Sequence, residues 1–379
     1  MAGQFQRAAV ICPIKRLGSL MDLAPFIDRT IKRFGPRTVL GLSSQAQALY
    51  RNRLADGIRN EGVTVFSLEN NYPKEQPVKL PEKVEQMLSN GNNLVMPVSD
   101  DADTSKSAGR ATRSIPNGFL AGTDSFCEGL YSIEHFLSQE FPFGFLDLTV
   151  ETSGEDVPCP IFMNGHLKLL QAVSELDRSG TPLRITENDR KPVIWTTGND
   201  KQSAEDFFRN NGLVPKNTIA MHLTANTYYV YRNMMSKRSF LKVARHFIGR
   251  GFSILLVSGS LRNSELSVYD TSFKTHRLFS EAINSPACRL FYGDPFVEAE
   301  LIRSCRLLLS GETGVAHIAS AVGTPKVTIA ANSFQVGHFL MTGPRDREFI
   351  VKESDFFHGK RFPKSCEVIE AMEEILQNQ

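Results

Sequence analysis

The sequence lacks the features of several large protein classes. Its six cysteines among 379 residues form no C-x-x-C pair and have no histidine at metal-ligand spacing, so we expect reduced core thiols and no metal site. No apolar run reaches about 18 residues, and the apolar stretch before Lys15 and Arg16 is too short for a signal peptide, which predicts a cytoplasmic protein. A net charge of only +2 gives no reason to expect nucleic acid as a partner.

The composition is that of a globular chain with room for two domains. Hydrophobic residues make up 41% and charged residues 22% of the 379 positions. Phenylalanine is common, with 26 in all and three within residues 141–145. That cluster suits a core or a plug between domains, and peripheral contact with a membrane is the alternative.

Strands alternate with helical segments along both halves. Short apolar strands are expected at residues 8–13, 38–42, 63–68, 93–98, 219–223, 252–258 and 289–292, and another begins at Leu307. This alternation predicts an α/β fold with two doubly wound parallel sheets. We expect an N-terminal domain over residues 1–178, a C-terminal domain over 190–364, and a last helix within 365–379 that can cross back to the first domain.

The segment from Leu307 to Ile329 has the pattern of an anion site. An apolar strand runs into a Gly-rich turn, a helix of small residues follows, and a second strand begins after Pro325. The backbone amides of Thr313, Gly314 and Val315 would open the helix, where unpaired N–H groups and the helix dipole favour a diphosphate. A strand, turn and helix with no ligand is the plainer interpretation of this segment.

Two further loops are expected at the same edge of the second sheet. Thr224, Lys237 and Arg238 belong to the first, Gly259 and Glu265 to the second, and Glu312, Thr313, Gly314, Val315 and His317 to the turn already described. Cations and helix N-termini suit phosphates, and carboxylates accept hydrogen bonds from ribose hydroxyls. The three loops together predict a nucleotide-diphosphate site.

These segments resemble the C-terminal domain of the heptosyltransferase family, inverting glycosyltransferases of the GT-B architecture. The family has a lysine before a helix, a glutamate after the next strand and an Asp-Thr-Gly-x-x-His-Leu motif, and Lys237, Glu265 and the 313–317 segment match these in order. The resemblance implies two Rossmann-like domains facing across a cleft. It also implies a nucleotide-sugar donor, possibly ADP-heptose, a glycan, lipid-linked or protein hydroxyl acceptor, and no other cofactor.

The first domain departs from the family at the catalytic base. The family places an aspartate after the glycine of its first loop, whereas Ser19 follows Gly18 here, and Glu312 replaces the aspartate of the C-terminal motif. We keep Gly18 and Ser19 as ligand-binding candidates. For the base, the cluster of Asp100, Asp101 and Asp103 after the 93–98 strand is the first candidate, because clustered carboxylates raise one another's pKa. Asp22, a solvated acidic loop and the absence of any base are the alternatives.

The expected activity is therefore metal-independent glycosyl transfer with inversion. A serine in place of the aspartate leaves two other functions open. One is a GT-B-like protein that binds a nucleotide sugar, or serves as a scaffold, without catalysis. The other is a sugar-nucleotide epimerase of the same architecture.

Overall fold

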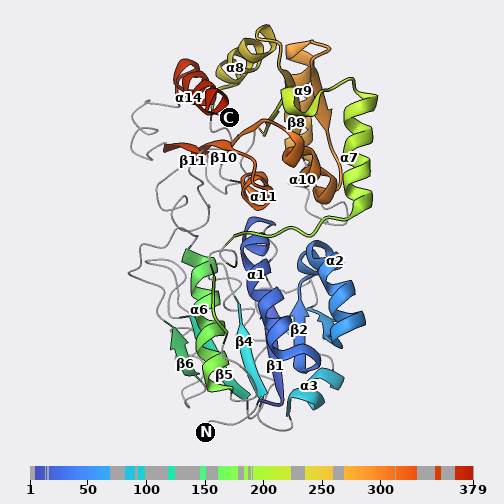
Figure 1. Cartoon of the computed structure of the whole chain (residues 1–379), viewed down its shortest axis with the longest axis vertical. Coiled ribbons are helices and arrows are strands. Elements are labelled where there is room, and N and C mark those ends of the chain that lie inside the picture. Colours follow the sequence, from blue (N-terminus) through green and yellow to red (C-terminus); the bar gives the residue numbers. More distant parts are fainter. Residues whose placement is uncertain are drawn as a thin grey trace. The chain divides into compact units, whose positions relative to one another are not determined.

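The computed structural model contains two compact units, Met1–Pro192 and Val193–Gln379 (Figure 1). It describes residues 5–12, 14, 17–68, 82–89, 93–98, 118–123, 146–150, 161–177, 183–186, 189, 191–222, 235–258, 269–311, 313–330, 346–350 and 363–378. Within this part of the chain, no helix has the length and apolar character needed to cross a membrane.

The first unit is built on a parallel sheet of six strands. These are β1 (Arg7–Cys12), β2 (Thr38–Leu42), β3 (Thr64–Ser67), β4 (Asn93–Pro97), β5 (Gly118–Thr123) and β6 (Leu146–Val150), in the order β3-β2-β1-β4-β5-β6. The helices with described bounds are α1 (Leu17–Phe34), α2 (Ser44–Glu61), α3 (Glu82–Ser89) and α6 (Ile161–Leu176), and a 3₁₀ turn occupies Gly35–Arg37. The strand order reverses between β1 and β4, which makes that pair the topological switch point of the sheet.

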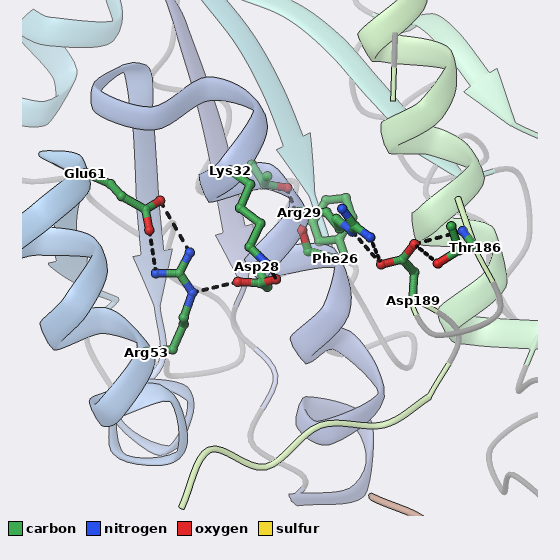
Figure 2. Close-up of polar contacts among 9 residues, drawn as sticks. Phe26, Asp28, Arg29, Lys32, Arg53, Glu61, Thr186 and Asp189 are labelled. Carbon is green, nitrogen blue, oxygen red and sulfur yellow. Dashed lines mark hydrogen bonds and ion pairs between the residues drawn. The ribbon is translucent and has the colours of Figure 1, made fainter. Parts of the chain in front are cut away.

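Ion pairs fix α1 to the elements beside it (Figure 2). Arg53 of α2 lies 2.6 Å from Asp28 of α1 and 2.9 Å from Glu61 at the end of its own helix. On another side of α1, Arg29 pairs with Asp189, whose carboxylate also accepts the backbone N–H of Thr186 at 2.8 Å. Helix α1 is therefore held on both sides by charge-assisted hydrogen bonds.

The second unit repeats the same topology. Its strands are β7 (Thr218–Met221), β8 (Ser253–Val257), β9 (Cys288–Phe291), β10 (Leu307–Gly311), β11 (Lys326–Ala330) and β12 (Arg347–Ile350), in the order β12-β11-β10-β7-β8-β9. Its helices are α7 (Gly198–Asn210), α8 (Lys237–Gly249), α9 (Tyr269–Ile283), α10 (Pro295–Ser304), α11 (Gly314–Val322) and α14 (Ser365–Gln377), with a 3₁₀ turn at Pro215–Asn217. Here the order reverses between β7 and β10.

Helices α8, α9 and α14 form one apolar core with the second sheet. Buried side chains of all three helices, such as Phe247, Phe279 and Met372, pack together with alternate residues of β7, β8, β10 and β11. Helix α10 contacts both α7 and α11 (Figure 1). The apolar face of α14, the last helix, thus lies in the core of the second unit.

The structure confirms the α/β class and the two parallel, doubly wound sheets. Strands β5, β6 and β12 were not expected from the sequence, and neither was helix α7. Two of these strands, β6 and β12, are at sheet edges, where polar residues are tolerated and the apolar signal is weak. Helix α1 begins at Leu17, so Gly18 and Ser19 are helical rather than part of a loop. Cys12, Cys288 and Cys305 are buried free thiols, as expected, whereas Cys366, at the start of α14, is a free thiol that is exposed.

Candidate functional site

The carboxyl ends of β7 and β10 meet at the switch point of the second sheet. The backbone N–H of His222, just past β7, donates to the carbonyl of Leu309 in β10 at 2.9 Å. Strand β8 pairs in parallel with the other side of β7, so β7, β8 and β10 end at the same edge. All three loops singled out in the sequence leave from this edge, which is where open parallel sheets bind their ligands.

Several of the expected ligand residues fall outside the described part of the chain. These are Thr224, Gly259, Glu265 and Glu312. The described part of the site is the start of α11, the start of α8 and the end of β7.

Two helices of the second unit begin with the same Thr-Gly pair, yet their first turns differ. At α7, the side chain of Asp200 accepts the N–H of Thr197 at 2.7 Å, and the Thr197 hydroxyl accepts the N–H of Asp200. This capping box satisfies the start of α7. At α11, Thr313 makes no capping hydrogen bond through its side chain, and the first turn contains no acidic residue. The start of α11 therefore has amide donors and no carboxylate of its own helix to receive them.

The Thr313 hydroxyl adds a second polar group at this turn. Its oxygen is buried and has no hydrogen-bond partner among the residues that the structure describes. The first helical bonds of α11 run from Ala316 and His317 to the Thr313 carbonyl, at 2.9 and 3.4 Å, so the amides of Gly314 and Val315 precede the bonded ladder. A buried polar group without a partner is costly, and an anion at the helix start would accept from the hydroxyl and both amides.

Gly314 and His317 both belong to α11. Gly314 is the first residue of α11, a right-handed position that any residue adopts, so the backbone conformation does not require glycine there. Close approach of a ligand is the reason that remains. His317 is on the buried face of the same helix, 3% exposed.

His222 was not singled out in the sequence. Its side chain is 8% exposed, and its Nδ1 lies 2.8 Å from the carbonyl of Val257 at the end of β8. Because a carbonyl oxygen can only accept, Nδ1 carries the proton. The ring lies 5.0 Å from that of the buried His276 of α9. His222 thus ties the ends of β8 and β10 to β7, and its place directly after the strand was the signal available in the sequence.

The start of α8 carries the cations expected from the sequence. Lys237 is the first residue of the helix, after Ser236, whose hydroxyl accepts the N–H of Ser239 at 3.1 Å. The Arg238 side chain is exposed. Met235, 1% exposed, anchors the segment before the helix in the core. The start of α8 is therefore defined by its Ser236 cap and by the buried Met235. The side chain of Lys237 is not among the parts that the structure describes.

In the first unit, two side chains fix the connection from β1 to α1. The Ser43 hydroxyl donates to the carbonyl of Ile14 at 2.5 Å, and its backbone N–H donates to Cys12 at 3.0 Å. The Tyr50 hydroxyl donates to the carbonyl of Leu20 in the first turn of α1 at 2.5 Å. Ser19, in that same turn, is 6% exposed.

Of the candidate bases, the structure describes Asp22 but not the three aspartates of the 100–103 loop. Asp22 is fully buried. The pKa of the neighbouring Tyr50 is raised mainly by burial, and the charges of Cys12 and Asp22 raise it further. A carboxylate enclosed in this way does not reach an external hydroxyl. Asp100, Asp101 and Asp103 lie outside the described residues. Val98 donates to the carbonyl of Ile11 at 2.9 Å, so their loop begins beside the end of β1, at the switch point of the first sheet.

Comparison with solved structures shows the fold. A glycosyl transferase of family 9 from Veillonella parvula matches with a TM-score of 0.62 and 14% identity, over 99% of this chain and 98% of that one. E. coli ADP-heptose lps heptosyltransferase II matches at 0.59 and 15%, over 98% and 99%. E. coli heptosyltransferase WaaC with ADP matches at 0.57 and 12%, over 97% and 99%. No protein-family model and no curated protein sequence matches the chain. The chain has the expected GT-B-like fold with two Rossmann-like domains.

Proposed function

We propose that the protein is a metal-independent glycosyltransferase that moves a sugar, with inversion, from a nucleotide-diphosphate donor to a hydroxyl acceptor. The observation that carries the proposal is the start of α11. Among the residues that the structure describes, the Thr313 hydroxyl has no hydrogen-bond partner, and the amides of Gly314 and Val315 precede the first helical bonds of α11. The first turn of α11 also lacks the acidic residue that completes the capping box of α7. An anion of the size of a diphosphate suits these donors.

The donor site in this proposal lies at the β7/β10 switch point. The amides of Gly314 and Val315, the Thr313 hydroxyl and Lys237 bind the diphosphate, with Arg238 as the neighbouring cation. Glu265 and Glu312 accept from the ribose hydroxyls, and Thr224 and Gly259 line the same edge. Structures of similar fold include one with ADP and one with ADP-2-deoxy-2-fluoro heptose, which supports an adenosine diphosphate sugar as the donor.

The reaction needs a base and charge stabilisation. A carboxylate of the Asp100, Asp101 and Asp103 loop takes the proton of the acceptor hydroxyl, whose oxygen attacks the anomeric carbon from the face opposite the diphosphate. The diphosphate leaves with its charge held by Lys237 and the α11 N-terminus. These groups neutralise the leaving group without a metal. The acceptor is a glycan, a lipid-linked sugar or a protein hydroxyl, bound by the first unit near Gly18 and Ser19.

Release of nucleoside diphosphate tests the proposal. Purified protein is incubated with ADP-heptose, or another nucleotide-diphosphate sugar, with and without candidate acceptors. Transfer requires ADP release that depends on the acceptor and a new glycosidic product of inverted configuration by NMR. Interconversion of the sugar without an acceptor would instead identify an epimerase. Donor binding by calorimetry with neither reaction would identify a binding protein, and no binding at all would remove the donor site.

A further inference from the structure

A buried ion pair lies in the second unit, at the start of β11. Lys326 is 1% exposed, and its Nζ lies 2.5 Å from Oδ2 of Asp346, just before β12. The other carboxylate oxygen, Oδ1, accepts the backbone N–H of Lys326 at 3.0 Å. A single aspartate thus holds both the main chain and the side chain of this lysine.

The lysine also contacts the helix of the proposed donor site. Its Nζ donates to Oγ of Ser320 in α11 at 2.9 Å, and the Ser320 hydroxyl donates to the carbonyl of Ala316 at 3.2 Å. Ala316 is in the first turn of α11, two residues after Gly314. A continuous chain of hydrogen bonds therefore runs from Asp346 through Lys326 and Ser320 to the turn that carries the free amides.

Burying a lysine has a large desolvation cost, which an apolar side chain of similar volume does not have. Replacing a buried ion pair by apolar residues of similar volume is often neutral or stabilising, so the pair contributes little to stability by itself. What an apolar side chain cannot supply is a directed bond to Ser320. At the other end of α11, the Thr324 hydroxyl donates to the carbonyl of Ile302 in α10 at 2.9 Å, so the position of the helix along its axis is fixed by polar contacts.

We propose that Lys326, held by Asp346 and acting through Ser320, is a positioning residue that sets the first turn of α11 for binding a diphosphate. The proposal rests on the proposed function for its ligand. The positioning itself is a property of the chain without ligand. The two are therefore tested by different measurements.

The first measurement is hydrogen exchange on the ligand-free protein. Ser320→Ala removes the link from Lys326 to α11 and leaves the Lys326–Asp346 pair in place. Ser304→Ala is the matched control, because the Ser304 hydroxyl makes the same kind of bond in α10, to the carbonyl of Glu300 at 2.9 Å, with no lysine attached. We expect the amides of Ala316 and His317 to exchange about two- to thirtyfold faster in Ser320→Ala and at the wild-type rate in Ser304→Ala. Equal rates in the two variants overturn the proposal.

The second measurement compares ADP with adenosine by calorimetry. Ser320→Ala should bind ADP about two- to thirtyfold more weakly and adenosine as the wild type does, because only the diphosphate contacts the α11 turn. A purely structural role would change both affinities together, and that result, or an unchanged ADP affinity, contradicts the proposal. If the wild-type protein binds no ADP, the proposed function is wrong. The hydrogen-exchange rates of Ala316 and His317 then still show whether Lys326 and Ser320 position the first turn of α11.

A double variant tests the role of Lys326 without changing Ser320. Lys326→Met with Asp346→Leu removes both charges and leaves neither one buried without a partner. We expect it to fold, to show the same faster exchange at Ala316 and His317, and to lose ADP affinity to the same extent. A folded double variant with wild-type exchange at these amides overturns the role of Lys326.

Discussion

At the scale of single residues, the starts of α7 and α11 differ at one position. Thr197 and Thr313 both precede a glycine at a helix start, and the difference between them is the carboxylate of Asp200, which has Ala316 as its counterpart in α11. In α7 the Asp200 carboxylate accepts both the N–H and the hydroxyl of Thr197. Ala316 has no carboxylate to do the same for Thr313, so in the proposed site the Thr313 hydroxyl is available to a ligand. Three predictions belong to this scale.

The first prediction concerns the cation at the start of α8. Lys237→Ala should weaken ADP binding about ten- to a hundredfold, because one charge-assisted contact to the diphosphate is lost. Lys242→Ala, in the same helix and exposed, is the control and should bind normally. Calorimetry measures both affinities. Unchanged binding in Lys237→Ala and in Arg238→Ala would remove the cationic part of the site.

The second prediction concerns Gly314. Gly314→Val should abolish ADP binding, since a branched side chain at the first position of α11 blocks close approach of a phosphate. Gly198→Val is the matched control, because Gly198 is the first residue of α7 and a Cβ there meets no atom within 4 Å. Circular dichroism should show both variants folded. Normal ADP affinity in Gly314→Val contradicts the phosphate turn.

The third prediction concerns the base. Asp100→Asn or Asp101→Asn should lower the turnover number about 10²- to 10⁴-fold with ADP affinity nearly unchanged, because general-base assistance is lost while the donor site is intact. Ser19→Asp should leave activity unchanged or lower it. If Ser19→Asp instead raises activity and the loop variants are neutral, the base is not in the 100–103 loop.

At the scale of elements, ion pairs dock α14 on the second unit. Glu373 of α14 pairs with Arg250 and lies 2.8 Å from His246 of α8, and Glu374 pairs with Arg347 of β12. The hydrogen bond from His246, together with Arg250, holds the pKa of Glu373 below its ordinary 4.5, and Arg347 does the same for Glu374. A carboxylate whose pKa is lower in the folded state stabilises that state above its unfolded pKa.

A pH dependence follows as the fourth prediction. The contribution of Glu373 and Glu374 is fully present above about pH 4.5 and is lost as the pH falls through their lower folded-state values. Glu373→Gln should therefore lower the melting temperature at pH 7 and reduce its fall between pH 5 and about 3. Glu281→Gln, an exposed partner of Arg277 within α9, is the control. A melting curve with the wild-type pH dependence in Glu373→Gln would contradict the role of these pairs.

At the scale of the whole molecule, the chain between the two units is bound at both ends. Asp189 pairs with Arg29 of α1 in the first unit, and the Thr196 hydroxyl donates to Glu300 of α10 in the second. Burial raises the pKa of Asp189, but the bonds from Thr186 and from Arg29 outweigh it and lower the pKa overall. The connection is thus held at Asp189 and again at Thr196.

The fifth prediction tests this docking. Asp189→Ala should raise the rate of limited proteolysis within residues 183–192 about ten- to a hundredfold, because releasing the segment from α1 no longer breaks a charge-assisted contact. Asp206→Ala is the control, since Asp206 pairs with Arg209 on the exposed surface of α7. Mass spectrometry of the early fragments locates the cut. Equal rates in the two variants would show that Asp189 does not hold the segment.

The sequence by itself determined the alternation of strands and helices and the place of the Thr313 turn. Both are local patterns: apolar runs, helical spacing and a Gly-rich turn between them lie within about 20 residues of one another. The expected strand at 38–42 accordingly agrees with β2 to the residue, and the strand expected from Leu307 begins where β10 does. Local patterns did not predict β12, because two of the four residues in Arg347–Ile350 are charged. The segment forms a strand by pairing with β11.

The tertiary structure decided which of these pieces meet. No local pattern tells that β7 pairs with β10, which is about 90 residues away, and this pairing creates the switch point and places His222 beside Leu309 of β10. Nor does the sequence tell a buried charge from an exposed one. Lys326 would be taken for a solvated strand end and Asp22 for an accessible acid, yet both are enclosed, because burial depends on residues that the fold brings from elsewhere in the chain.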